Sequence, residues 1–541
     1  MRILIWSFVQ QSPDSVYWHF FKDGLEALGH QVIAVDAFAL TEIFGPRRMQ
    51  DILLTYARAY RVQVALVVPQ NFVDTDFLQA LRAQGVAVVG YRYDDGLVAS
   101  PGMAPPPLTV LKNFTYLDAA CDLNVTICRN AIPLFASMGL PTPVYLPTPT
   151  VWPLIDATPK PQRRVIAYAG SPKYRETGPL SIRVAIAQAL LAAGLPVELH
   201  HDAWATVPGC EAAARPTPTM TEHFDILRTS TVNLAISADW GPVIFPMLKG
   251  IHLEIAVVGG MMLTTQCTEL DDYFTAGTDV AYAETVEDYV RQARYYLDHP
   301  EEARRLGRSA RSAVERVGNW SLWWSGVAGH LATHGVTLDL DAPARQPDPA
   351  ETTVLGMAAT ALAHAHEQAG KPVQAAIYYN EMLAYDPHDY SAHCGLARLE
   401  ATGETARRHW QAAHANIGKT LCVKLPNRLN WPGIGEQGTN FAVEAAYHLA
   451  RTGMADRDWD ALMQAMPTLV QFDHEVAPPV ITWLTEQGLT DLAGRCADLH
   501  VAFWSELADA WHLRGDIAFD QGRYAAASAD HARGDAIVGR P

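Results

Sequence analysis

Residues 248–265 read LKGIHLEIAVVGGMMLTT, and this stretch decides the fold. An apolar segment with helical spacing ends at Gly259-Gly260, and an apolar run of strand length, Met261–Thr264, begins at once. A helix followed directly by a buried strand is half of a βαβ unit, so we expect a parallel sheet covered by helices.

The same alternation continues on both sides of this stretch, over residues 164–335. Runs rich in β-branched residues alternate with longer runs of helical period, which predicts a second Rossmann-like lobe there. The predicted strands are Val165–Ala169, Val197–His201, Thr231–Ile236 and Gly260–Thr264. The predicted helices are Leu180–Ala193, one that ends near Val258, Val286–Leu297 and Pro300–Val317.

Residues 1–150 show an earlier series of the same kind and predict an N-terminal Rossmann-like lobe. The predicted strands are Arg2–Phe8, Gln31–Asp36, Gln63–Val68, Val86–Tyr91, Leu123–Ile127 and Val144–Leu146. The predicted helices are Val16–Leu28, Gln50–Tyr60 and Phe77–Gln84. A proline-rich linker, 151–163, separates the two lobes. Two such lobes facing each other form a cleft, and open α/β sheets bind ligands at the carboxyl ends of their strands.

Beyond a second linker, 336–350, residues 351–541 are rich in alanine and predict an all-α domain. Small and aromatic residues recur there at the offsets of tetratricopeptide-type repeats, which lets paired helices approach closely. These residues are Ala375, Tyr379, Met382, Ala406, Trp410, Ala413, Trp511, Gly515, Ala518, Gly522, Tyr524 and Ala527. A generic alanine-rich bundle is the alternative. The stretch 424–438 fits neither pattern and is expected to be a loop or insertion.

The overall composition limits the class of protein. The chain of 541 residues has 41 basic and 58 acidic residues, a formal net charge of −17, which disfavours generic binding to nucleic acid or anionic membrane. We find no signal peptide and no apolar run long enough to span a membrane. Seven dispersed cysteines without a CxxC pair fit reduced thiols, so we expect a cytoplasmic protein.

Lys249 and Glu254 are the first candidate ligand-binding residues. A carboxylate on a helix at a cleft mouth can accept hydrogen bonds from both ribose hydroxyls, and a nearby lysine can neutralise phosphate. Gly259 and Gly260 would let the backbone approach a ligand closely. The alternative for Glu254 is an ordinary solvated surface group.

The second candidate is the loop that contains Gly170, Ser171, Lys173 and Arg175, between a predicted strand and a predicted helix. Free N–H groups and the positive end of a helix dipole favour an anion there, and the two basic side chains add full charges. An exposed basic turn is the alternative.

Three further residues follow predicted strands. Asp94 and Asp95 could orient an acceptor hydroxyl, or could cap the next turn. Trp240 could stack on a base or sugar, or fill the core. No metal site is expected, since His200 and His201 are adjacent on a strand and point to opposite faces. We therefore expect neither a metal nor another cofactor.

The second lobe resembles the CgeB-type (spore-maturation-protein-like) glycosyltransferases, which are close to family 4 with the GT-B fold. The residues that carry the resemblance are Lys249-Gly250, Glu254, Gly259-Gly260 and the tail YYLDHPEEARRLGRSAR at 295–311. The resemblance is good over 164–325 and looser over 1–150. Three positions depart from the pattern, and one of them is Leu253, which stands where the family has phenylalanine. Ile251 stands where the family has arginine, and Pro246 stands where the first acid of its acidic pair would fall.

The resemblance implies a bacterial-type, metal-independent transferase that uses a nucleotide-sugar donor with retention of configuration. Glu254 would bind the donor ribose, and its diphosphate would lie near Lys173, Arg175 and Lys249. The acceptor would enter near Asp94 and Asp95. The fusion to repeats suggests a protein acceptor recruited by 351–541. A non-catalytic scaffold that binds a protein partner is the alternative, favoured by Ile251 and Pro246, and a nucleotide-sugar epimerase on the same fold is a third hypothesis.

Overall fold

The structure is a computed structural model of the chain. It describes residues 1–6, 18–67, 73–92, 120–129, 131–137, 141–149, 158, 160–172, 181–236, 248–318, 320–336, 338, 345, 347–400, 403–416, 438–472 and 474–539. The chain forms two compact units, residues 1–348 and 349–541.

The first unit begins with a sheet of six parallel strands in the order β2-β1-β3-β4-β5-β6. The strands are β1 (Arg2–Trp6), β2 (Gln31–Val35), β3 (Val64–Val67), β4 (Ala87–Arg92), β5 (Leu123–Thr126) and β6 (Val144–Tyr145). Each lies where the sequence predicts a strand.

The helices of this lobe differ more from the prediction. They are η1 (Trp18–Asp23), α1 (Gly24–Glu26), α2 (Ala37–Phe44), α3 (Pro46–Ala59), α4 (Thr75–Ala83) and α6 (Ala131–Ser137). The helix predicted over 16–28 is a π-helical turn, η1, followed by the short α1. Helix α2 is not among the predicted helices, because its sequence, AFALTEIF, is apolar on most sides and shows no helical period. Its start is fixed by Asp36, whose side chain accepts a hydrogen bond from the Ala39 N–H at 2.9 Å.

The second sheet also has six parallel strands, in the order β12-β11-β10-β7-β8-β9. The strands are β7 (Arg163–Ala169), β8 (Val197–His200), β9 (Ala214–Arg215), β10 (Ser230–Ala235), β11 (Met262–Thr264) and β12 (Ala281–Tyr282). The helices that follow or connect them are α7 (Ile182–Ala192), α8 (Met220–Thr229), α9 (Gly250–Val257), α10 (Val286–Asp298) and α11 (Pro300–Val317). Short 3₁₀ turns are η4 (Asp202–Thr206), η5 (Glu211–Ala213) and η6 (Leu270–Asp272).

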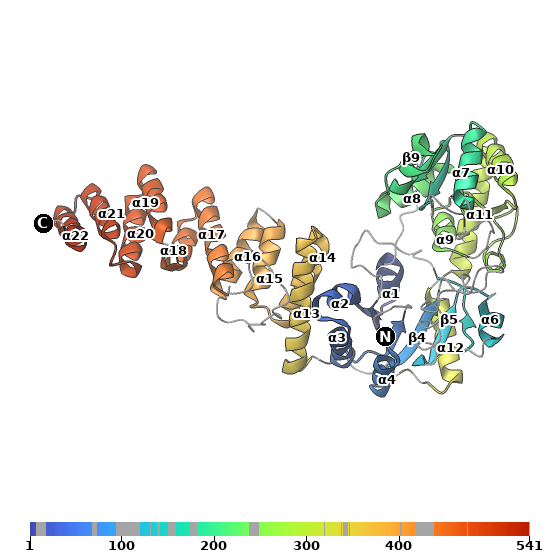
Figure 1. Cartoon of the computed structure of the whole chain (residues 1–541), viewed down its shortest axis with the longest axis horizontal. Helices are drawn as coiled ribbons and strands as arrows, with labels where there is room; N and C mark the ends of the chain where they lie inside the picture. The colour runs from blue at the N-terminus through green and yellow to red at the C-terminus, as the bar shows by residue number, and fades with distance from the viewer. Residues whose placement is uncertain are drawn as a thin grey trace. The chain divides into compact units, whose positions relative to one another are not determined.

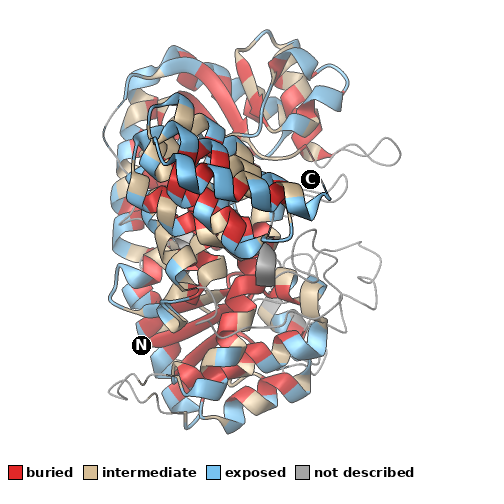
Figure 2. Ribbon diagram, turned by 90° about the vertical axis from the view of Figure 1, so that its left-hand side faces the viewer, coloured by how far each residue is buried: buried red, intermediate tan, exposed pale blue. Residues whose placement is uncertain are grey.

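Helices cover both faces of this second sheet. On one face, α7 and α10 contribute Leu190 and Tyr289 to an apolar cluster. On the other, α8, α9 and α11 contribute Phe224, Leu253 and Val314. The central strands are therefore buried on both sides, as Figure 2 shows by colour, and they read as continuous apolar runs. Together with the helical second unit, the two lobes confirm the predicted α/β GT-B architecture followed by an all-α region.

Helix α12 (Trp320–Thr333) follows the second lobe in sequence but contacts the first. The Trp320 ring lies 6.0 Å from Phe21, and the Trp323 ring lies 5.6 Å from Tyr91. A Cβ on Gly326 would stand 2.8 Å from Leu146, so α12 approaches the first lobe closely. The first lobe is therefore completed by a segment that the chain reaches only after the second.

The second unit consists of antiparallel helix pairs that follow one another along the chain (Figure 1). The helices are α13 (Pro349–Gln368), α14 (Pro372–Tyr385), α15 (Tyr390–Glu400), α16 (Glu404–Ala415), α17 (Gly438–Asp456), α18 (Trp459–Phe472), α19 (Ala477–Glu486), α20 (Thr490–Phe503), α21 (Ala508–Asp520) and α22 (Tyr524–Ile537), with a 3₁₀ turn, η7 (His474–Val476). The predicted all-α region is confirmed.

The predicted repeat residues lie mostly inside these helix pairs. The Tyr379 ring fills the space over Gly395 of the next pair, where a Cβ would meet it at 2.1 Å. Trp410 stacks on His448 with ring centroids 4.3 Å apart. Tyr524, in contrast, is 64% exposed. The paired helices agree with the repeat hypothesis, and the tetratricopeptide assignment itself stays a prediction.

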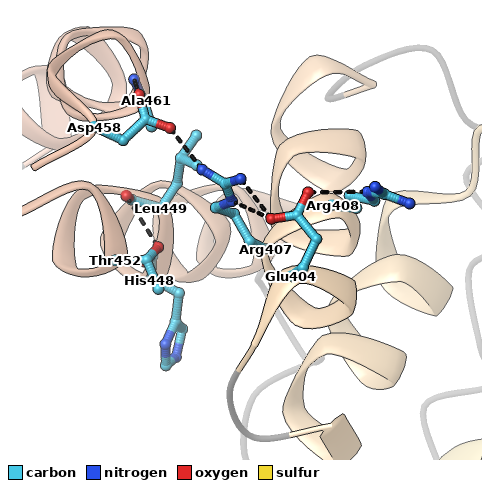
Figure 3. Close-up of polar contacts among 8 residues, drawn as sticks. All are labelled: Glu404, Arg407, Arg408, His448, Leu449, Thr452, Asp458 and Ala461. Atoms are coloured by element: carbon cyan, nitrogen blue, oxygen red, sulfur yellow. Dashed lines mark hydrogen bonds and ion pairs between the residues drawn. The ribbon is translucent and has the colours of Figure 1, made fainter. Parts of the chain in front are cut away.

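A polar cluster joins α16 to the start of α18 (Figure 3). Arg407 donates to Glu404 at 3.0 Å and to Asp458 at 2.9 Å. Asp458 in turn accepts from the Ala461 N–H at 3.1 Å and caps α18. This cluster and the Trp410–His448 stack hold α16 against the next pair. The predicted insertion at 424–438 lies outside the described residues, except for Gly438 at the start of α17.

Candidate active site

The amino end of α9 is fixed by a buried histidine. The Lys249 N–H donates to His252 Nδ1 at 3.0 Å, while His252 Nε2 lies 3.0 Å from Thr264 Oγ1. Since Thr264 gives its own proton to the Ala235 carbonyl, His252 Nε2 carries the proton and the ring is neutral. Burial, with Lys249 nearby, lowers the pKa of His252 to about 4. The position of Lys249 is thus set by a neutral hydrogen-bond chain that runs back to the sheet.

Glu254 lies on the second turn of α9, and its partner is a residue on α8. His223 Nε2 is 2.9 Å from Glu254 Oε2, and the two side chains are only 14% and 15% exposed. The alternative interpretation of Glu254 as an ordinary solvated surface group is therefore wrong. Oε1 has no hydrogen-bond partner among the residues that the structure describes. Glu254 presents one engaged and one available carboxylate oxygen.

The Lys249-Gly250 step has a steric role beside this carboxylate. Side chains on a helix lean toward its amino end, so residue 254 extends over residue 250. A Cβ on Gly250 would stand 3.1 Å from Glu254 Oε1. Glycine at this position leaves space next to the available oxygen.

Gly259 and Gly260 have a packing role. Gly259 ends α9 with φ +72°, in the left-handed region that favours glycine. A Cβ on Gly260 would stand 2.7 Å from the Leu227 carbonyl, and one on Gly307 of α11 would stand 2.1 Å from the Gly259 carbonyl. The glycines allow three segments to meet. Their predicted contact with a donor stays a prediction.

The loop after β7 is anchored at its described start. Trp204 Nε1 donates to the Gly170 carbonyl at 2.8 Å, and Arg183 donates to the Ser171 carbonyl at 3.0 Å. Arg183 belongs to α7, whose first turn is capped by Ser181. Both carbonyls are thereby turned inward, toward the protein.

Six residues named from the sequence lie outside the described part of the chain: Asp94, Asp95, Lys173, Arg175, Trp240 and Pro246. The described flanks still show where two of the loops begin. Strands β7 and β10 are parallel neighbours, so the loops after Ala169 and Ala235 leave the same edge of the sheet. This is the edge at which open α/β sheets bind ligands.

The sequence analysis missed His223 and the whole of α8. The available signal was Thr219-x-x-Glu222, a capping box that the structure forms in full. It also missed the contacts between the two lobes. The Arg129 N–H donates to Glu269 at 2.8 Å, and the Arg129 guanidinium binds Asp272 at 2.6 Å and lies over the Tyr145 ring.

Tyr145 completes this interlobe cluster by donating its hydroxyl proton to Asp272. Burial, and then the hydrogen bond to that carboxylate, raise the pKa of Tyr145 well above its ordinary value. Tyr273 adds a bond of 2.9 Å to the Thr148 carbonyl. The second lobe is therefore attached to β5, β6 and the segment after them by charged and neutral hydrogen bonds.

A pocket of about 470 Å³ is lined by residues of α8, of the segment before it, and of β7, β8 and β9. Its charged side chains already take part in hydrogen bonds or ion pairs. Arg163 binds Glu198 at 3.0 Å, and Asp225 binds Lys160 at 2.7 Å. This pocket is separate from the predicted donor-binding residues. Over the described residues, no group of three or more histidine, cysteine or acidic side chains could hold a metal ion.

In the part of the chain that the structure describes, no helix is both long and apolar enough to cross a membrane. A family model described as "Glycosyl transferase-like" matches residues 181–321, which include His223, Lys249, Glu254 and both glycines. No curated protein sequence matches the chain significantly.

Similar solved structures include a sucrose-phosphate synthase from Thermosynechococcus elongatus, with 13% identity, a TM-score of 0.44, and coverage of 62% of this chain and all of that one. An alpha-glucosyltransferase in complex with UDP and DNA has 11% identity, a TM-score of 0.45, and coverage of 61% and 99%. Anabaena HepE in complex with UDP has 10% identity, a TM-score of 0.42, and coverage of 62% and 100%.

Proposed function

We propose that this protein is a glycosyltransferase that moves a sugar from a nucleotide-sugar donor to an acceptor. The family match to the second lobe supports this activity. The observation that carries the proposal is Glu254, a mostly buried carboxylate held by His223 with Oε1 left available. A carboxylate of this kind is an acceptor for sugar hydroxyls, and the donor ribose offers two of them.

The basic residues of the proposed site act on the donor diphosphate. Lys249, at the start of α9, and Lys173 and Arg175, in the loop after β7, would neutralise the charge that grows on the departing nucleoside diphosphate. Asp94 and Asp95 would orient the acceptor. The finer assignments, a CgeB-type, bacterial-type retaining enzyme that needs no metal, rest on the sequence resemblance. The cytoplasmic location rests on the seven dispersed cysteines.

Binding of nucleotides tests this proposal. Thermal shift and calorimetry of the full chain against UDP-, GDP-, CDP- and dTDP-linked sugars should show one base that stabilises the protein, because a ligand that binds only the native state raises its apparent stability. Glu254→Ala should weaken that binding at least tenfold, which is about 1.4 kcal/mol. His299→Ala, an exposed substitution in the same lobe, is the matched control.

We propose further that the acceptor is a protein recruited by residues 351–541. Stacked helix pairs present extended surfaces that bind peptides, and this region consists of such pairs. A chain shortened to residues 1–348, the first compact unit, should keep nucleotide binding and lose transfer to protein. Unchanged transfer to protein by the shortened chain contradicts this acceptor.

A non-catalytic scaffold is the second candidate function, and one observation favours it. Ile251, which replaces the arginine of the resembled family, packs against the apolar cluster of α9 and α11 and brings no charge to the site. If no nucleotide sugar binds the folded protein, the scaffold becomes the better proposal. Recruitment of a protein partner by the helical region would then be the activity to measure.

A further inference from the structure

We infer that His223 is a positioning residue that orients Glu254 for a ribose hydroxyl and so makes the site selective for ribonucleotide over 2′-deoxyribonucleotide donors. This inference rests on the proposed function. It concerns a residue on α8 that lies outside α9 and outside both loops in which the sequence placed donor-binding residues.

The backbone of His223 is fixed from two sides. Thr219 caps α8 through a reciprocal capping box with Glu222, which satisfies two N–H groups at the start of the helix. The next residues on the helix, Phe224 and Leu227, are buried in the cluster that also contains Leu253 of α9. The imidazole therefore projects toward α9 from a rigid helix–helix contact.

The hydrogen bond between the two side chains has one direction. A carboxylate oxygen only accepts, so His223 Nε2 donates its proton to Glu254 Oε2 at 2.9 Å. This bond fixes the plane and rotation of the carboxylate. Oε1 is left on the side where Gly250 has no side chain.

A fixed oxygen of this kind discriminates between ligands. When the 2′-hydroxyl of the ribose donates to it, the charge is compensated. When the hydroxyl is missing, a partly buried anion keeps one unpaired oxygen, which costs more than a neutral contact would. Without His223 the carboxylate can rotate toward solvent, and the penalty for the missing hydroxyl falls.

The experiment measures binding of nucleoside diphosphates to the full chain by calorimetry. The probes are UDP, GDP and CDP with their 2′-deoxy forms, and the pair whose ribonucleotide binds wild type most tightly is followed. The variants are His223→Ala, His223→Gln, whose amide can still donate, and His299→Ala as a histidine of the same lobe that makes no contact with Glu254. Thermal unfolding of each variant checks that it is folded.

Wild type should prefer the ribonucleotide about tenfold, which is about 1.4 kcal/mol. His223→Ala should weaken binding of the ribonucleotide about tenfold and change binding of the 2′-deoxy form less than twofold. His223→Gln should restore much of the preference for the ribonucleotide. Equal loss for both nucleotides, or an unchanged preference in His223→Ala and His223→Gln, overturns the inference and leaves the proposed function standing. Absence of any nucleotide binding to folded wild type overturns both.

Discussion

Two glutamates, one in each compact unit, are buried to a similar extent but differ in how many hydrogen bonds their carboxylates accept. Glu254 of the second lobe is 15% exposed and, among the described residues, has one hydrogen-bond partner, His223. Glu367 on α13 is 21% exposed and accepts from Arg398 at 2.7 Å and 3.0 Å through both oxygens, and also from Tyr379. Similar burial therefore accompanies one available oxygen in the first case and none in the second.

The comparison separates a binding carboxylate from a structural one. Burial alone would raise the pKa of Glu367, yet the hydrogen bonds from His364, Arg398 and Tyr379 hold it well below the ordinary glutamate value. A carboxylate stabilised this fully has no capacity left for a ligand. Among the described residues Glu254 keeps that capacity, as the proposed donor site requires.

The largest expected effect comes from removing the arginine that pairs with the structural carboxylate, Glu367. Arg398→Ala should lower the unfolding free energy of the helical unit by about 3 kcal/mol, because Glu367 would keep its charge without its main partner. Hydrogen exchange of α13–α15 in the full chain measures this. Arg408→Ala removes an ion pair whose arginine is 74% exposed, and should cost at most about 0.5 kcal/mol. Equal effects of the two variants would contradict the assignment of Glu367.

The next effect is a pH dependence in the second lobe. The pKa of buried His252 is about 4, while an unfolded histidine titrates near 6.5, so the unfolded state binds more protons as the pH falls between these values. The free energy of unfolding should therefore be about 2 kcal/mol lower at pH 5 than at pH 7. Denaturant unfolding at both pH values measures the drop.

His252→Gln is the control for this pH dependence, since its amide does not titrate. The variant should lose less stability than wild type over the same interval. Identical pH slopes in the two proteins would show that other groups carry the acid sensitivity.

The smallest effect is the one that sharpens the comparison most. Glu254→Gln removes the charge that His223 and the proposed ligand share, yet it keeps the shape of the side chain. It should change the unfolding free energy by less than about 0.5 kcal/mol, because a carboxylate kept for a ligand contributes little to the fold. Thermal unfolding without ligand tests this. A loss as large as that of Arg398→Ala would assign Glu254 a structural role.

Most of the fold could be predicted because its signals are local. Parallel strands buried on both faces read as apolar runs, and Pro300–Val317 was predicted with the bounds of α11. Helix α12 was not predicted, because WSLWWSGVAGHLAT has no clear apolar face and its three tryptophans find partners far away in sequence. Periodicity reports which residues are buried, and it does not report which lobe buries them.

The site could be predicted only in part, for a related reason. Lys249, Glu254 and the glycine pair lie within twelve residues and share one local pattern. His223 is 31 positions away from Glu254, and the fold alone brings them together. The packing role of Gly259 likewise depends on Gly307, on another helix. Contacts between helices that are distant in the sequence produce no regular spacing of residues from which they could be predicted.

The return of α12 to the first lobe has a consequence for synthesis. The ribosome completes strands β1–β6 early, but the aromatic residues that cover Tyr91 and Phe21 are Trp323 and Trp320, which emerge only after all of the second lobe. Domains generally fold as units while the chain grows. The amino-terminal lobe is thus the first to be translated and the last to be closed, and until about residue 333 has left the ribosome its apolar surface is available to chaperones.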